Sequence, residues 1–378
     1  MNFDLPDFPW DSLAGAKARA AEHPDGLVDL SVGSPADPVA PSARAALAAA
    51  SDAHGYPVTA GTSELRGAIA SALARDFGLS AVAGEPCAFG DLFPVIGAKE
   101  AIAWLPTLLG AREGDTVVIP RLAYPTYEVA AKLARAQVVR ADHPDELPPL
   151  AKPPVLWFLN SPANPHGAIA RPGLLAEILA WTRAHGAVLV SDECYLRFAW
   201  EGEAVCALHP SVTGGEPQGV IVVHSLSKIA NLAGYRAGYI AGDPVIVREL
   251  LALRRHAGMI LPGPVQAAVA AALRDAGELD AQRERYRARR AALRPALADS
   301  GLRVEHSEGG LYLWATRGEP AGATVDWFAE RGVLVAPGSF YGQDGAQHVR
   351  VALTATDEDI AKVVRRLGVT VSPAGRLV

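Results

Sequence analysis

The chain contains little cysteine: three residues among 378, namely Cys87, Cys194 and Cys206. The number is odd and no two of them form a CxxC pair, so the sequence predicts neither a disulfide framework nor a zinc site built on paired cysteines. The ten histidines include no pair at metal-ligand spacing within one expected element. We therefore expect no metal site from the sequence.

The sequence also lacks a long hydrophobic run and an excess of positive charge. No apolar stretch approaches the roughly 18 residues needed to span a bilayer. The opening MNFDLPDFPW has neither the basic start nor the apolar core of a signal peptide. With 35 Lys and Arg against 41 Asp and Glu, the net charge is -6, which gives no strong positive field for nucleic acid or an anionic membrane. We expect a cytoplasmic protein that binds neither.

What remains is an ordinary globular composition, with 50% hydrophobic and 20% charged residues and no linker, repeat or low-complexity segment. Short, continuous apolar runs alternate with Ala- and Leu-rich stretches. Such runs are typical of parallel strands covered on both faces, and the alternation predicts an α/β doubly wound sheet. The expected strands are Thr116–Pro120, Val155–Asn160, Ala187–Asp192 and Val220–His224. The expected helices are Lys99–Leu109, Thr126–Arg135 and Gly173–His185.

The pattern of short apolar runs and helical stretches changes in the last third of the chain. Val265–Asp299 is a long Ala- and Arg-rich helical stretch. Short apolar runs and helical patterns follow it, which indicates a smaller α+β domain. We expect an N-terminal arm and part of the small domain over 1–37, a large domain over 38–262, and a linker helix with the small domain over 263–378. The first 35 residues are expected to pack on the small domain or on a partner subunit.

Chemistry-bearing residues follow the expected strands. Ligands bind beyond the carboxyl ends of strands in open α/β sheets, so these residues are expected to converge. They comprise a carboxylate, a lysine, an arginine, an amide, two tyrosines and a small-residue helix start. In chain order they are Gly97 to Lys99, Tyr124 and Tyr127, Asn160 to Gly167, Asp192 to Tyr195, and Ser225 to Gly238.

Three of these segments resemble one family. SLSKIANLAGYRAG, beginning at Ser225, resembles the S-x-S-K-x(5)-G-x-R-x-G signature of class I and II aminotransferases, which are fold-type I enzymes that use pyridoxal 5'-phosphate. NSPANPHG resembles their N-P-x-G segment, and SDECY resembles their D-E-x-Y segment. The resemblance extends from Leu30 to Arg350. It implies an α/β fold, with a large domain built on a mostly parallel doubly wound sheet and a smaller α+β domain.

The resemblance also implies roles around the cofactor ring. Lys228 would bond to the cofactor aldehyde and, once freed, move a proton as general base and acid. Asp192 ends a buried apolar run and would keep the pyridine nitrogen protonated, since a nearby opposite charge favours the charged form. Tyr195 and Asn164 resemble the pair that hydrogen-bonds the phenolic oxygen. Tyr124 resembles the aromatic residue that stacks on the ring, whereas Tyr127 is expected to face the core.

Further residues match the family's phosphate and carboxylate sites. Backbone amides at a helix start, hydroxyls and a guanidinium suit a phosphate; this set is Ala98, Lys99, Ser225, Ser227 and Arg236. Tyr56 resembles the tyrosine that reaches the phosphate from the other subunit, which implies a homodimer. Arg350 resembles the arginine that grips the substrate α-carboxylate, for which a planar fork is suited. Gly33 resembles the glycine whose backbone closes over the substrate.

The sequence departs from the family at two places: His166 stands for the usual threonine of N-P-T-G, and Ile229 follows the lysine. Longer segments, among them LPDFPW, AYPTYEVAAKLA and HAGMILPGPVQAA, resemble bacterial N-succinyldiaminopimelate aminotransferases of lysine biosynthesis. Glutamate is then the expected donor. Cationic groups should line the distal pocket for the extra carboxylates, and the candidates are Lys99, Arg121, Arg254, Arg255 and His256.

Other functions stay open at this point. An aspartate or aromatic aminotransferase, or a β-lyase that cleaves C–S bonds, would share these cofactor residues. A ligand-sensing regulatory protein with an aminotransferase-like domain would need a DNA-binding extension, and the segment before Leu30 is too short for one. A nicotinamide-dependent enzyme is disfavoured because no G-x-G-x-x-G follows an early strand.

Overall fold

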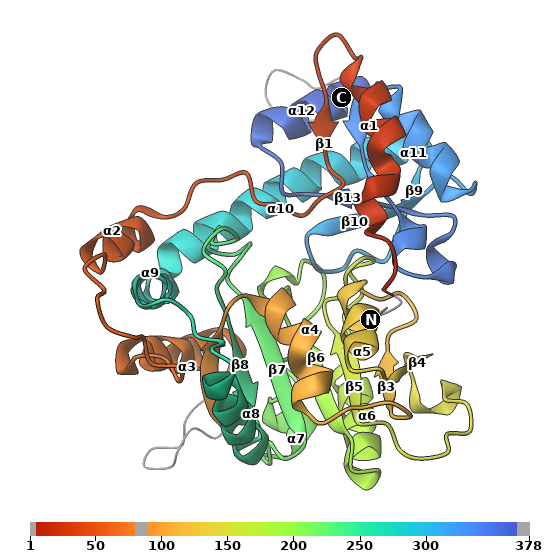
Figure 1. Cartoon of the computed structure of the whole chain (residues 1–378). Coiled ribbons are helices and arrows are strands. Elements are labelled where there is room, and N and C mark those ends of the chain that lie inside the picture. Colours follow the sequence, from red (N-terminus) through yellow and green to blue (C-terminus); the bar gives the residue numbers. More distant parts are fainter. Residues whose placement is uncertain (1–4, 80–89, 369–378) are drawn as a thin grey trace.

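The computed structural model describes residues 5–79 and 90–368, so Cys87 lies outside the described residues. A seven-stranded sheet forms the centre of the larger part of the molecule (Figure 1). Its strand order is β2 (Asp91–Val95), β8 (Gly238–Gly242), β7 (Val220–Ser225), β6 (Val188–Asp192), β5 (Leu156–Asn160), β3 (Thr116–Ile119) and β4 (Gln137–Arg140). Only β8 runs antiparallel to its neighbours, which confirms the prediction of a mostly parallel sheet.

The central strands β5, β6 and β7 are apolar except at their carboxyl ends, and their apolar residues pack on both faces of the sheet. Along β7, Val220 and Val222 belong to one hydrophobic cluster and Ile221 and Val223 to the other. Successive side chains of a strand point to opposite faces, so one continuous apolar run serves both clusters. The four predicted strands are confirmed to within about a residue. The other three strands of the sheet, β2, β4 and β8, were not among these four.

Among the described residues, eight helices belong to this part of the chain, and several of them, such as α4, α5, α6 and α8, contact strands of the sheet. They are α2 (Pro41–Ala49), α3 (Ser63–Phe77), α4 (Ala98–Leu108), α5 (Thr126–Leu133), α6 (Pro172–Ala184), α7 (Pro210–Thr213), α8 (Pro244–His256) and α9 (Gly263–Arg274). Two 3-10 turns, η2 (Pro144–Glu146) and η3 (Leu196–Phe198), lie between them. The three predicted helices are confirmed, with ends that differ by one or two residues. In the part of the chain that the structure describes, no helix is both long and apolar enough to cross a membrane.

The smaller part contains a four-stranded antiparallel sheet with helices. Its strands are β12 (Ala336–Pro337), β13 (Val349–Ala352), β10 (Tyr312–Thr316) and β9 (Arg303–Glu305), in that order. Its helices and turns are α11 (Ala321–Ala329), α12 (Asp357–Arg366), η4 (Gly338–Phe340) and η5 (Gln343–Gly345). The N-terminal segment carries η1 (Pro9–Leu13), α1 (Ala14–Ala21) and β1 (Val28–Asp29). It packs on this part, since β1 pairs with β11 (Val333–Leu334) and α1 contacts α11.

The predicted single helical stretch Val265–Asp299 is in fact two helices. α9 ends at Arg274, and α10 (Ala276–Asp299) begins after Asp275, whose side chain accepts a hydrogen bond from the Glu278 amide. α9 packs against α2 and α3, whereas α10 runs toward the small sheet (Figure 1). The boundaries 1–37, 38–262 and 263–378 remain our proposed domain division.

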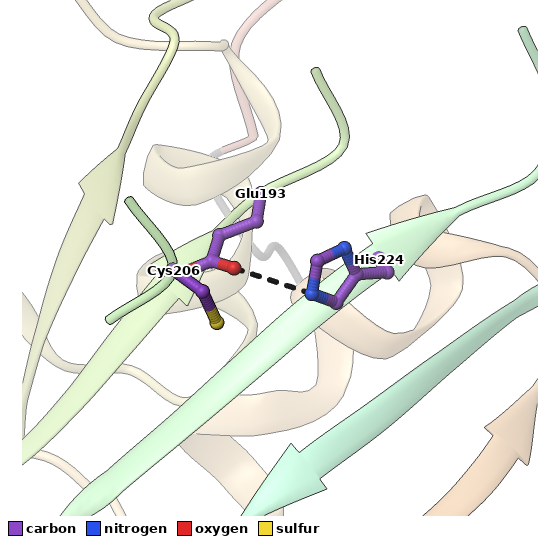
Figure 2. A group of neighbouring side chains, drawn as sticks. All are labelled: Glu193, Cys206 and His224. Carbon is purple, nitrogen blue, oxygen red and sulfur yellow. Dashed lines mark ion pairs between the residues drawn. The ribbon is translucent and has the colours of Figure 1, made fainter. Parts of the chain in front are cut away.

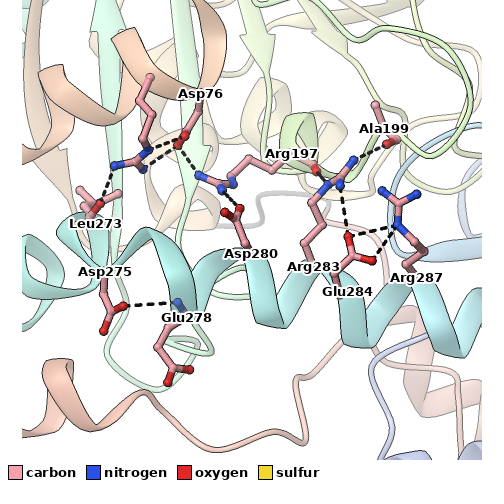
Figure 3. A network of polar contacts seen from close by, with 11 residues as sticks. Asp76, Arg197, Ala199, Leu273, Asp275, Glu278, Asp280, Arg283, Glu284 and Arg287 are labelled. Carbon is pink, nitrogen blue, oxygen red and sulfur yellow. Dashed lines mark hydrogen bonds and ion pairs between the residues drawn. The ribbon is translucent and has the colours of Figure 1, made fainter.

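A polar network fastens α10 to the segment that follows β6 (Figure 3). The guanidinium of Arg197 in η3 pairs with Asp76 of α3 and, at 2.9 Å, with Asp280 of α10. Arg283 of α10 donates hydrogen bonds to the carbonyls of Arg197 and Ala199. The network therefore holds η3 in place shortly after β6, the strand that ends at Asp192.

Candidate active site

One cavity of about 880 Å³ lies where the carboxyl ends of the large-sheet strands meet α4, the small sheet and the N-terminal segment. Most predicted site residues line it. These are Gly33, Ala98, Lys99, Tyr124, Asn164, Asp192, Tyr195, Ser225, Ser227, Lys228, Arg236 and Arg350. Tyr56 is the exception, since it is fully exposed in the single chain. The structure thus brings together residues that span more than 300 positions of sequence.

Asp192 lies at the end of β6 with its side chain buried. Burial raises the pKa of its carboxyl group, while hydrogen bonds from Cys194 and Tyr127 and the charge of Lys228 lower it. The Cys194 amide donates to Oδ1 at 3.1 Å, and the Tyr127 hydroxyl donates to Oδ2 at 2.6 Å. A buried, oriented carboxylate of this kind fits a cationic ring nitrogen such as that of pyridoxal phosphate.

Tyr127 has a role in the site that the sequence did not reveal. As expected, it faces the core, where it is fully buried and stacks on Phe158 with ring centroids 4.8 Å apart. Its hydroxyl nevertheless reaches Asp192, so the same side chain packs in the core and orients the carboxylate. Nothing in the local sequence marks it, because the two residues are 65 positions apart.

We expect Tyr127→Phe to lower kcat for glutamate by about tenfold, the range for a hydrogen bond to a charged group. Without the donor, the pKa of Asp192 rises further. The carboxylate then becomes protonated at a higher pH as the pH falls, so the acid limb of the kcat–pH profile moves upward. Steady-state rates across pH measure this, with Tyr235→Phe as a control outside the Asp192 contacts. An unchanged acid limb would exclude the orienting role.

The start of α4 forms a cradle for an anion. Gly97 has a φ of +80°, and a Cβ at this position would lie 2.6 Å from Nη2 of Arg236. Only glycine therefore lets the backbone approach the guanidinium this closely. The helix start has no side-chain cap, and Ser225, Ser227 and Arg236 share the cavity with it. Uncapped helix amides, hydroxyls and a guanidinium fit the cofactor phosphate.

Arg350, on β13, is a buried cation. It donates to Oδ1 of Asn164 at 2.9 Å and to the Ser31 carbonyl at 2.7 Å, and its guanidinium lies 3.9 Å from the ring centroid of Tyr312. Its Nε has no hydrogen-bond partner, and no carboxylate pairs with it among residues 5–79 and 90–368. A buried charge without a counter-ion is costly. The arrangement therefore favours an anionic ligand here, as the resemblance implies for a substrate carboxylate.

Tyrosines close the cavity around this arginine. The hydroxyls of Tyr195 and Tyr312 lie 3.1 Å apart, and burial followed by the influence of Tyr312 raises the pKa of Tyr195 well above its usual value. Burial likewise raises the pKa of Tyr124 to about 12. Both phenols therefore stay protonated at neutral pH and can donate hydrogen bonds. A Cβ at Gly33 would lie 2.1 Å from the Tyr312 hydroxyl, so glycine permits this close approach.

The N-terminal segment contributes an aromatic wall that had no predicted role. Phe8 and Trp10 line the cavity with ring centroids 5.5 Å apart, and Trp10 packs on Phe340 at 5.4 Å. The ammonium of Lys99 lies 5.9 Å from the Phe8 ring centroid. The motif LPDFPW is visible in the sequence, but only the fold places it over the cavity.

The distal cation candidates are mostly not in the cavity. Lys99 lines it. Arg254 is instead buried in a bidentate pair with Glu100, at 3.1 and 3.0 Å, and Arg121 pairs with Asp344 at 2.8 Å. Arg255 and His256, at the end of α8, do not line the cavity either. The prediction for these four residues is corrected: their charges are placed elsewhere, while Lys17, which was not predicted, does line the cavity.

The departure at His166 leaves a neutral side chain. Burial, with a smaller effect of His306, lowers the pKa of His166 to about 3. Its Nδ1 accepts a hydrogen bond from the Ala168 amide at 3.2 Å. His166 therefore adds no positive charge beside Asn164 at physiological pH. Ile229, the second departure, is buried in the hydrophobic core.

A mostly parallel sheet with a lysine, an acid, an arginine and an uncapped helix start at its carboxyl edge defines a fold-type I enzyme that uses pyridoxal phosphate. Residues 25–367 match the family model "Aminotransferase class I and II". The chain belongs to this family and is a pyridoxal-phosphate-dependent aminotransferase.

Three comparisons illustrate the relationship. The chain is 57% identical to a probable aminotransferase, Rv1178, of Mycobacterium tuberculosis, over 97% of this chain and 86% of that protein. It is 52% identical to the 4-dedimethylamino-4-oxo-anhydrotetracycline transaminase OxyQ of Streptomyces rimosus, over 96% and 99%. A solved structure of a probable N-succinyldiaminopimelate aminotransferase from Thermus thermophilus superposes with a TM-score of 0.82 at 28% identity, over 95% and 99%.

Proposed function

We propose that this aminotransferase moves an amino group between glutamate and N-succinyl-2-amino-6-oxopimelate, the succinyldiaminopimelate transaminase reaction of lysine biosynthesis. When bound, the cofactor supplies an aldehyde carbon that accepts and returns the amino group and a ring that withdraws electrons. The family establishes this coarse chemistry. The substrate and the individual residue roles are our proposal.

We assign the roles within the cavity as follows. Lys228, on the turn after β7, moves the proton between the substrate carbon and the cofactor as base and then acid. Asp192 holds a proton on the ring nitrogen, and Tyr195 and Asn164 donate to the ring oxygen. Arg350 orients the substrate through its α-carboxylate.

The remaining proposed roles concern anchoring and packing. Tyr124 covers one face of the ring. The amides of Ala98 and Lys99 hold the phosphate together with Ser225, Ser227 and Arg236, and Gly33 closes over the substrate.

The observation that carries the substrate proposal is one cavity of about 880 Å³ lined by cationic side chains from separate elements. Arg350 on β13 is buried, whereas Lys99 at the start of α4 and Lys17 in α1 have exposed side chains that line the same cavity. N-succinyl-2-amino-6-oxopimelate carries three carboxylates, so it can use one cation at the reacting end and others further out. The similarity to the Thermus thermophilus structure, a probable N-succinyldiaminopimelate aminotransferase, supports the same substrate class.

The test is a comparison of amino acceptors. The purified enzyme, loaded with pyridoxal phosphate and glutamate, is offered N-succinyl-2-amino-6-oxopimelate, oxaloacetate and phenylpyruvate in turn, and 2-oxoglutarate release is measured. Cystathionine is tested separately for C–S cleavage. We expect the highest kcat/KM with the succinylated acceptor. A higher value with either small acceptor, or cleavage of cystathionine, would overturn the proposal.

Lys99→Ala should separate the distal carboxylates from the chemistry. The substitution keeps the backbone amide and removes one exposed ammonium, so we expect about a tenfold loss of kcat/KM with the succinylated acceptor, since a charge-assisted hydrogen bond contributes about 1.5–3 kcal/mol. The glutamate half-reaction should change less than about twofold. Lys362→Ala, which removes a lysine paired with Glu358 and Asp359 on α12, is the matched control.

A second candidate is a bulky aromatic ketone. Phe8, Trp10 and Tyr124 give the cavity an aromatic lining, and flat rings gain large contact area against such walls. The relative OxyQ is a transaminase for 4-dedimethylamino-4-oxo-anhydrotetracycline, a polycyclic ketone. A kcat/KM with phenylpyruvate or a tetracyclic ketone above that of the succinylated acceptor would favour this candidate.

We also propose that the active form is a homodimer in which Tyr56 reaches the phosphate of the partner subunit. Tyr56 is 100% exposed and Val58 is 56% exposed, although both are large hydrophobic residues. A dimer would cover both side chains. It would also bring the Tyr56 phenol to the phosphate cradle of the partner subunit, which Tyr56 does not reach within its own chain. Sedimentation equilibrium, together with cofactor affinity in Tyr56→Phe, tests both parts.

A further inference from the structure

Figure 2 shows a second cluster of reactive side chains, none of which lines the aminotransferase cavity. Glu193 follows β6, His224 lies in β7, and Cys206 belongs to the segment after η3. All three are at most 5% exposed. One carboxylate oxygen, one ring nitrogen and the sulfur lie within 4.8 Å of one another. The aminotransferase chemistry assigns no task to any of them.

Two of the atoms face each other without any other partner. Oε2 of Glu193 lies 3.2 Å from Nε2 of His224, and neither atom makes a hydrogen bond. The other carboxylate oxygen, Oε1, accepts hydrogen bonds from the Ser191 hydroxyl at 2.9 Å and the Ala207 amide at 2.7 Å. The carboxylate is thus fixed with its other oxygen directed toward the imidazole, and it also interacts with the Cys206 thiol.

The imidazole is held just as firmly. His224 stacks on both Phe77 and Tyr239, with ring centroids 5.2 and 4.9 Å away. These aromatic contacts fix the orientation of the ring, whose nitrogens remain for polar contacts. A firmly oriented imidazole and a firmly oriented carboxylate are the arrangement that metal ligands require, because their geometry is then set before the ion arrives.

The spacing and the ligand types suit one ion. Zinc binds imidazole nitrogen and carboxylate oxygen at about 2.0–2.1 Å in a tetrahedron, which places two such atoms about 3.3 Å apart. Glu193 Oε2 and His224 Nε2 are at nearly this separation. A cavity of about 30 Å³ borders Glu193 and His224, which is room for one water molecule as a fourth ligand.

We propose that Glu193, Cys206 and His224 form a structural Zn²⁺ site. On binding, the Cys206 thiol releases its proton to solvent, and the sulfur moves toward the ion as a thiolate. One carboxylate, one thiolate, a neutral imidazole and a divalent cation sum to zero charge, so the assembly can be buried without a counter-ion. The ion would join the end of β6, β7 and the segment after η3. Sequence spacing gives no sign of it because the three ligands come from separate elements.

The holoenzyme, expressed with Zn²⁺ in the medium and purified without chelator, is analysed for metal by atomic emission. We expect one Zn²⁺ per chain. Cys206→Ser and Glu193→Gln, which nearly preserve side-chain volume, should each weaken binding at least about tenfold, since even an outer-shell change costs 10- to 100-fold. His185→Ala, which removes an exposed histidine, should bind like the wild type.

Co²⁺ gives a second readout of the same ligands. In the wild type it should produce visible bands of a tetrahedral site, and Cys206→Ser should lose the thiolate-to-metal band. Circular dichroism confirms that each variant is folded. Less than about 0.1 Zn²⁺ per chain, or equal binding by wild type and Cys206→Ser, would overturn the proposal and leave a plain Glu193–His224 ion pair. Neither readout measures transamination, so the substrate proposal stands or falls separately.

Discussion

Replacing Lys228 with alanine is expected to reduce the glutamate half-reaction by about 10⁴-fold or more. This is the upper range for loss of a positioned acid–base group that is also a covalent anchor, the role that we propose for Lys228. Lys228 lines the cavity on the turn after β7, and its charge reaches both Asp192 and Cys194. The other lysines that line the cavity, Lys17 and Lys99, lie in α1 and at the start of α4 and not on this turn. Single-turnover mixing with glutamate measures the rate.

The same variant has a spectroscopic signature. Wild-type protein should show the long-wavelength absorbance of cofactor bonded to an amine, and Lys228→Ala should show that of free aldehyde held by the phosphate cradle. Lys99→Ala, which keeps its amide in that cradle, should retain the wild-type band. A Lys228→Ala protein with the wild-type spectrum, or with more than about 1% of the wild-type rate, would place the anchor elsewhere.

The sequence was sufficient for the parts of the site that depend on strand ends. Continuous apolar runs predicted β3, β5, β6 and β7, and parallel strands bring their carboxyl ends to one edge. Asp192 and Lys228 could therefore be expected in one cavity from the sequence alone, since each follows such a run. β8 has the sequence GYIAG, whose glycines hide the strand pattern, and β4 is a four-residue strand at the edge of the sheet without a fully buried residue.

Other parts depend on contacts that no local pattern encodes. The Tyr195 hydroxyl meets that of Tyr312 across 117 positions. Arg254 seemed free to bind a substrate, but Glu100, 154 positions away, takes up its charge. A residue type and a motif can indicate chemistry, whereas the availability of a charge depends on what the fold packs beside it. This is why Lys99 remains a distal candidate and Arg254 does not.

Asp192→Asn is expected to lower the rate of the glutamate half-reaction by about 10³-fold, the upper range for removing one electrostatic group aimed at developing charge. The amide keeps the shape and can still accept from Tyr127, but it cannot hold a proton on a ring nitrogen through opposite charge. The loss should therefore appear in kcat more than in KM, because the substitution leaves Arg350, the proposed binding partner of the substrate α-carboxylate, unchanged. Asp91→Asn, which alters a carboxylate paired with Arg66 on the far edge strand β2, is the matched control. A loss of less than about tenfold, or one confined to KM, would mean that another group keeps the ring nitrogen charged.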